Sequence, residues 1–174
     1  MMKPSPETRG GAPVGYLNEL GPIEASAIVY LRLWCDSPAA REQIAVDFEV
    51  ALGPRGGEDA VAVLGALCDA CVENGRRPLL RHDVTCRCMG GDEACFAHMV
   101  AAAIEGAGFE GVNGKARDGA TQDAFLLASN IVNPRAARPL VLLARRFGLA
   151  LRRIVGQQEI PIHDPLPNTQ PTIH

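Results

Sequence analysis

Apolar residues recur every three or four positions along most of the chain, which is the spacing of one face of an amphipathic α-helix. No stretch alternates apolar and polar residues convincingly enough to predict a strand. The sequence therefore predicts an all-α fold, a single-domain bundle of five or six helices. The predicted helices cover roughly residues 23–35, 38–52, 58–73, 92–105, 120–132 and 139–155.

Proline and glycine mark where these helices begin and end. Ser37 followed by Pro38 predicts an N-cap with proline in the first helical turn. The stretch 53–57, Gly-Pro-Arg-Gly-Gly, predicts a break between the second and third helices. Residues 76–91 lack periodicity and contain proline and glycine, so they predict an irregular loop that is rich in cysteine and histidine.

Both ends of the chain lack the helical period. Residues 1–20 and 157–174 are rich in proline and polar residues, which predicts flexible tails on one helical domain, residues 21–156. The N-terminus has no secretory signal, and the apolar run 23–34 contains charges and is too short to span a bilayer. The sequence therefore predicts a cytoplasmic protein with no membrane partner.

Composition narrows the function classes. Aromatic residues make up 5% of the chain, which supplies few stacking platforms for single-stranded nucleic acid. The net charge of −3 argues against a surface built as a whole to bind nucleic acid. The nucleophile-elbow, Walker and His-Glu-x-x-His motifs are missing from the sequence, so an enzyme is the less favoured class.

Six cysteines are the most informative feature, because a reducing compartment favours metal ligands, redox centres or core positions over structural disulfides. Cys86, Cys88, Cys95 and His98 form a Cys-x-Cys, six-residue spacer, Cys-x2-His pattern. Four such ligands fit tetrahedral zinc, which predicts a zinc site. Substitute ligands are His82, Cys68 and Cys71.

The helical positions of these residues separate them into two groups. On the helix 92–105, His98 faces away from the apolar stripe and Cys95 lies on its flank, as ligands would. Cys68 and Cys71 lie in the middle of an apolar stripe, which favours core positions, and Cys35 is interpreted as structural.

The order Cys-x-Cys, spacer, Cys-x-His resembles the zinc-binding motif of SWIM zinc fingers. The match covers Cys86 to His98 and departs by one residue in its last pair. The resemblance serves as an analogy for how such ligands chelate zinc.

The same cysteines allow two other interpretations. Arg77, Arg81 and Arg87 could lower the pKa of a thiol at Cys86 or Cys88, which predicts a redox sensor or enzyme. A Cys-x-Cys disulfide closes a small, strained ring that is readily reduced, which suits a switch. An iron–sulfur cluster could use the same thiolates.

The last predicted helix carries a basic face, and exposed leucines among its arginines suit a protein partner or self-association better than DNA. The alternative interpretations are a DNA-associated regulator and a solvated face that pairs with the acidic helices between 36 and 75. Asp92 and Glu93 are expected to be exposed acids in a first helical turn. The leading hypothesis is a zinc-binding regulatory or interaction module. The residues of the last helix that are predicted to contact a partner are Arg138, Leu142, Arg145, Leu149 and Arg152.

Overall fold

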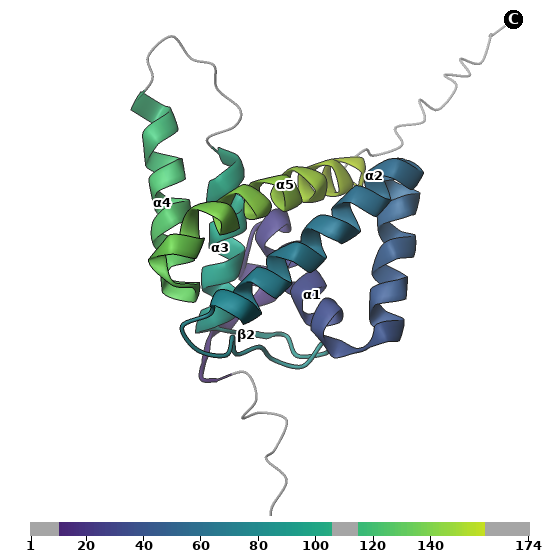
Figure 1. Ribbon diagram of the computed structural model, residues 1–174. Helices are drawn as coiled ribbons and strands as arrows, with labels where there is room; N and C mark the ends of the chain where they lie inside the picture. The colour runs from purple at the N-terminus through teal and green to yellow at the C-terminus, as the bar shows by residue number, and fades with distance from the viewer. Residues whose placement is uncertain (1–10, 106–114, 159–174) are drawn as a thin grey trace, which may run out of the picture.

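Helices dominate the structure, a computed structural model that describes residues 11–105 and 115–158, without the side chains of 115–121 and 158. The all-α class predicted from the helical period is confirmed, whereas the packing of the helices as a bundle stays a prediction. Five α-helices and a small sheet make up the described part (Figure 1). The elements are β1 (Pro13–Tyr16), a 3-10 helix (Leu17–Glu19), α1 (Pro22–Asp36), α2 (Pro38–Asn74), β2 (Cys88–Gly90), α3 (Gly91–Glu105), α4 (Lys115–Ile131) and α5 (Pro134–Gln158).

Helix α2 covers both helices predicted over 38–52 and 58–73, and the predicted break between them lies inside α2 as a kink at Gly53. Gly53 has φ 77°, in the left-handed region that glycine adopts at no steric cost, and it bends the helix there. The helix resumes at once, because Pro54 fits a first helical turn. A Cβ atom on Gly57 would lie 2.6 Å from the backbone nitrogen of Glu49, so the two halves of α2 cross in close contact.

Side-chain caps set the starts of α2 and α5. The Ser37 hydroxyl accepts from the backbone N–H of Ala40 at 3.2 Å, which confirms the predicted cap. Helix α5 begins five residues before the predicted position 139, because the Asn133 side chain accepts from the backbone N–H groups of Arg135 and Ala136.

A two-stranded antiparallel sheet holds the beginning of the described chain against the cysteine-rich segment. Strand β1 pairs with β2, with Gly15 opposite Met89 and Tyr16 opposite Cys88. Leu17 extends the contact by donating its N–H to the carbonyl of Arg87 at 2.9 Å. Residues 13–19, expected to be part of a flexible tail, therefore form a strand and a 3-10 helix, and the strand pairs with the segment before α3.

The core lies between the helices. Helix α3 packs against α1, α4 and α5, and α5 also packs along α2 (Figure 1). None of the described helices is long and apolar enough to cross a bilayer. The expectations for residues 1–10 and 159–174 concern parts of the chain outside the described residues. The largest fully buried apolar side chains include Phe48, Phe96, Phe147, Ile44, Leu64, Leu67, Met99, Leu140 and Leu151.

Candidate functional site

A buried ion pair lies beneath the Cys-x-Cys segment. Arg32 on α1 is 1% exposed and Glu93, in the first turn of α3, is 0% exposed. The guanidinium donates from Nε to Oε1 of Glu93 at 2.7 Å and from Nη2 to Oε2 at 3.0 Å. This bidentate contact is the strong, directional form of an arginine–carboxylate pair, and it joins α1 to α3.

The same guanidinium holds the backbone of the cysteine-rich segment. Nη1 donates to the carbonyl oxygens of Asp83 at 3.2 Å and Cys86 at 2.6 Å, and Nη2 donates to that of Cys88 at 2.7 Å. With the two bonds to Glu93, all five N–H donors of Arg32 are used. An irregular loop offers few backbone partners of its own, so Arg32 supplies donors to three of its carbonyls, of which that of Asp83 also accepts from the N–H of Cys86.

Glu93 fixes the two ends of that segment. Its carboxylate accepts from the backbone N–H of His82 and of Gly90, both at 2.9 Å. Burial alone would raise the pKa of Glu93, but the hydrogen bonds from Arg32, Gly90 and His82 outweigh burial and lower it. Glu93 is therefore ionised, and the expectation that it is an exposed first-turn acid is wrong.

His82 is buried against the same carboxylate. Its ring Nδ1 lies 3.0 Å from Oε2 of Glu93. Because an ionised carboxylate can only accept, Nδ1 carries the hydrogen in this contact. The other ring nitrogen, Nε2, is buried and has no hydrogen-bond partner among the described residues.

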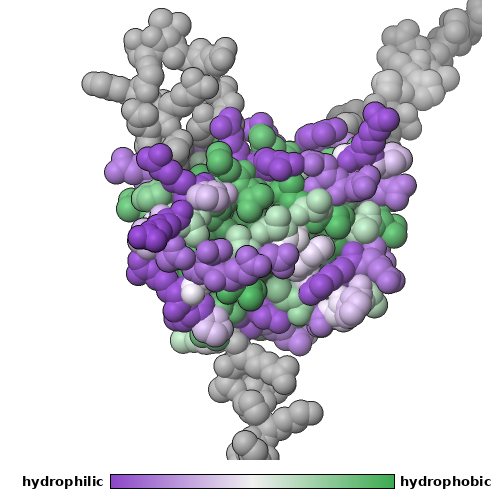
Figure 2. Space-filling view, in the orientation of Figure 1, coloured by the Kyte–Doolittle hydropathy of each residue, from purple (hydrophilic) through white to green (hydrophobic). Residues whose placement is uncertain are grey.

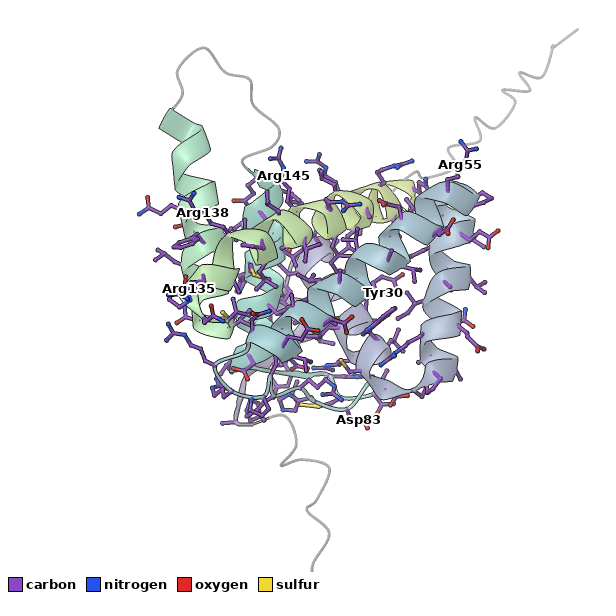
Figure 3. All side chains as sticks on the ribbon, viewed as in Figure 1. Tyr30, Arg55, Asp83, Arg135, Arg138 and Arg145 are labelled. Carbon is purple, nitrogen blue, oxygen red and sulfur yellow. A yellow bond between two sulfur atoms is a disulfide. The ribbon has the colours of Figure 1, made fainter. Side chains whose placement is uncertain are left out.

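Cys86 and Cys88 are joined by a disulfide bond in the loop that Arg32 supports, near Asp83 in Figure 3. Both cysteines are half-buried, so part of the pair faces solvent. A turn precedes them, in which Cys86 donates its N–H to the carbonyl of Asp83 at 3.0 Å. The Asp83 carboxylate accepts from the N–H and the hydroxyl of Thr85 and so fixes the same turn.

Cys95 faces a different neighbour. Its thiol donates to the carbonyl of Leu127 on α4, with a sulfur to oxygen distance of 3.4 Å. Burial raises the pKa of Cys95, and the negative charge of Asp92 raises it further, against a lowering by Arg77. Cys95 is therefore a protonated thiol directed at α4, not a member of the Cys86–Cys88 pair.

His98 is exposed, as its helical position predicts, and lines a shallow pocket of about 420 Å³ with Glu24 and Asp123. The structure thus brings together Cys86 and Cys88 and places Cys95 and His98 elsewhere. In the part of the chain that the structure describes, no three or more His, Cys, Asp or Glu side chains are grouped so as to hold a metal ion. Binding of zinc or of an iron–sulfur cluster stays a prediction.

Cys68 and Cys71, the other substitute ligands, are each 5% exposed in the core, which confirms their predicted positions. They line one pocket together with Cys35, which is half-buried near the end of α1. None of the three is in a disulfide.

The predicted contact face on α5 is largely open to solvent. Arg138, Arg145 and Arg152 are exposed, Leu142 is 63% exposed and Leu149 is half-buried. Hydrophobic and hydrophilic side chains intermingle over this helix in Figure 2, and Arg138 and Arg145 extend from it in Figure 3. Its use by a partner stays a prediction.

One arginine of α5 does pair with an acidic helix. Arg146 donates to the Asp59 carboxylate on α2 at 2.7 Å, with both side chains more than half exposed. To this extent the basic face pairs with the acidic helices, as the solvated-face interpretation expects.

Sequence reasoning missed the Arg32–Glu93 pair. Its signal lies on α1, where Arg32 continues the buried stripe formed by Ile28 and Leu31. A charged residue on a buried stripe demands a partner of opposite charge. The sequence could not identify Glu93 as that partner, because 61 residues separate the two.

No family model, curated protein or solved structure matches the chain. The resemblance to the SWIM motif therefore rests on the residues from Cys86 to His98 alone.

Proposed function

We propose that the protein is a thiol–disulfide redox protein whose working pair is Cys86 and Cys88. The observation that carries the proposal is the disulfide between them in a partly exposed loop anchored by Arg32. In the reducing compartment predicted from the sequence, a disulfide of this kind is typically transient and serves catalysis or sensing.

The crosslink contributes little as a structural staple. The two cysteines are separated by 2 positions, so the disulfide closes a very short loop. The chain-entropy relation gives about 1.6 kcal/mol for three residues, against about 4.7 kcal/mol for a 100-residue loop. Arg32, Glu93 and strand β1 already hold the same segment by hydrogen bonds. Folding therefore has little need of the S–S bond.

Exchange with a partner dithiol takes two steps. A partner thiolate attacks one sulfur of the pair, the S–S bond breaks, and the other sulfur leaves as a thiolate and takes up a proton. The partner's second thiolate then attacks the partner's own sulfur in the mixed disulfide. The partner departs as a disulfide, and Cys86 and Cys88 are left as thiols after the uptake of two electrons and two protons.

Arg32 holds this loop through backbone carbonyl groups, which reduction of the sulfurs leaves chemically unchanged. It binds the carbonyl oxygens of Cys86 and Cys88 and leaves the side chains to change. Both oxidation states can therefore share one loop conformation, which lowers the reorganisation needed for exchange.

The test is to equilibrate the protein in glutathione buffers of increasing oxidised fraction, alkylate the remaining thiols and map the peptides. The peptide with Cys86 and Cys88 is expected to pass reversibly from two alkylated thiols to an internal disulfide, while circular dichroism stays unchanged. The Cys95→Ser variant is the matched control and should show the same transition. The proposal fails if this peptide keeps one state across the whole series.

Metal analysis of the reduced protein separates this function from the zinc hypothesis. We expect substoichiometric zinc and rapid alkylation of Cys86 and Cys88. Stoichiometric zinc that blocks this alkylation, and that is lost in Cys95→Ser, would replace the redox proposal by the zinc site.

A further inference from the structure

A second group of cysteines lines a pocket between α1, α2 and the segment after α2. Cys35 comes from α1, and Cys68 and Cys71 lie one turn apart on α2. The pocket has a volume of about 490 Å³, within the range of about 300–1,000 Å³ for small-molecule sites. Leu31 and Leu79 contribute apolar wall.

Three arginines give the pocket a positive wall: Arg76, Arg77 and Arg81. The Arg77 guanidinium is neutralised by Asp92 through two hydrogen bonds of 2.6 Å. Arg76 and Arg81 donate to backbone carbonyls, those of Val132 and Cys35, and neither forms an ion pair with a carboxylate of the described residues. Two positive charges without a carboxylate partner among the described residues therefore border the three cysteines.

The surroundings make Cys35 the reactive thiol. A hydrogen bond from Cys68 lowers the pKa of Cys35 most, burial raises it, and the charges of Arg81 and Arg41 lower it further, to about 6. The pKa of Cys68 is raised by that same hydrogen bond with the Cys35 thiolate and by burial. Cys35 is also the most exposed of the three: it is half-buried, whereas Cys68 and Cys71 are each 5% exposed, so a substrate in the pocket reaches Cys35 first.

We propose that this pocket is a second redox site, in which Cys35 attacks a small anionic disulfide and Cys68 resolves the product. The arginines select for negative charge, and the apolar wall accommodates the carbon skeleton of the substrate. This site uses none of the atoms of the Cys86–Cys88 pair and does not depend on its proposed function.

The reaction takes two balanced steps. The Cys35 thiolate attacks one sulfur of the substrate R–S–S–R, the S–S bond breaks, and one R–S⁻ leaves, so that Cys35 carries a mixed disulfide. Cys68 loses its proton to solvent and attacks the Cys35 sulfur, which releases the second R–S⁻. The products are two R–S⁻ groups and a Cys35–Cys68 disulfide, with two electrons passed to the substrate.

The mechanism is tested with oxidised glutathione as the probe in a Cys86→Ser/Cys88→Ser background, which removes the first pair. We expect peptide mapping to show a Cys35–Cys68 disulfide. Adding Cys68→Ser should stop the reaction at one glutathionyl group on Cys35, because the serine hydroxyl keeps a hydrogen-bond donor and cannot resolve the bond. Circular dichroism confirms that each variant is folded.

Two results overturn this mechanism. One is a Cys35 that stays unmodified in the folded background protein, and the other is a Cys68→Ser variant that accumulates no mixed disulfide on Cys35. Should Cys68→Ser fail to fold, the folded background protein still decides the matter through the presence or absence of the Cys35–Cys68 disulfide.

Selection for negative charge is tested by the ratio of rate constants for oxidised glutathione and the neutral 2-hydroxyethyl disulfide. Arg76→Met should lower this ratio about fivefold, the effect of one exposed charge near the substrate. Arg138→Met, which removes an exposed arginine of α5, is the matched control and should leave the ratio unchanged. An equal ratio in the parent and Arg76→Met would show that the pocket does not recognise the anion.

Discussion

Replacing Arg32 by methionine removes the guanidinium that joins α1, α3 and the cysteine-rich segment. The change deletes both hydrogen bonds to Glu93 and those to the carbonyls of Asp83, Cys86 and Cys88. Methionine fills a similar volume, so the effect is mainly electrostatic. A buried ion pair that loses one partner leaves an uncompensated charge, which costs about 3–5 kcal/mol. Whole domains are stable by about 5–15 kcal/mol, so the variant should be severely destabilised.

The assay is urea unfolding followed by circular dichroism at pH 7.5 and again at pH 5.5. At the lower pH the cost should shrink, because Glu93 without Arg32 has a raised pKa and can take up a proton in the folded variant. Arg146→Met is the matched control. Its exposed pair with Asp59 is expected to contribute about 0–1 kcal/mol, with little change between the two pH values.

A second variant separates the loss of the pair from the loss of packing. Arg32→Met combined with Glu93→Leu removes both buried charges and should recover part of the stability. Recovery remains incomplete, because the backbone N–H groups of His82 and Gly90 lose their acceptor. A cost for Arg32→Met as small as that of Arg146→Met, or one independent of pH, would refute this account of the buried pair.

Two further predictions concern titration. The pKa of Glu93 is lowered in the folded state, so the ionised carboxylate stabilises the fold fully at pH values above 4.5, the ordinary pKa of glutamate. This stabilisation is lost as the pH falls through the pKa of the folded state. Glu93→Gln should therefore flatten the acidic part of a curve of unfolding free energy against pH, measured by urea unfolding. Alkylation of Cys35 by iodoacetamide in the Cys86→Ser/Cys88→Ser protein should rise with a midpoint near pH 6 and then level off. Cys71 should stay unreactive in the same pH series, because burial raises its pKa to about 12. A midpoint near pH 9 for the alkylation of Cys35 would contradict the proposed thiolate.

Local signals predicted the helices and the buried cysteines well. The apolar period and the Ser37 cap depend on neighbouring residues, and the structure confirms both. The predicted break between the second and third helices is confirmed as the kink at Gly53, but it is shorter than residues 53–57. A single residue with positive φ suffices to turn the helix, and Pro54 can begin the next turn.

The candidate site was harder to predict, because its contacts join distant segments. Strand β1 forms only because Cys88–Gly90 lies beside it, and neither segment alternates long enough to signal a strand. The spacing from Cys86 to His98 predicts which residue types could bind a metal, but it does not predict that their side chains point to one place. On α3 the helical position predicts that His98 meets solvent, but it does not predict that the Cys95 thiol meets α4.

Helix α1 connects the two proposed thiol sites. Arg32 anchors the loop of the first, Cys35 supplies the nucleophile of the second, and three positions on a helix place them on neighbouring parts of one face. The loop residues Arg81 and His82 are held at both sites. Arg81 donates to the Cys35 carbonyl at 3.1 Å, and Glu93 accepts from the backbone N–H of His82. Release of Arg32 should therefore loosen Cys86 and Cys88 first, whereas the Cys35 pocket keeps its α2 wall. Because the loosened loop must then reorganise during exchange, the Arg32→Met variant should slow reduction of the disulfide more than it changes alkylation of Cys35.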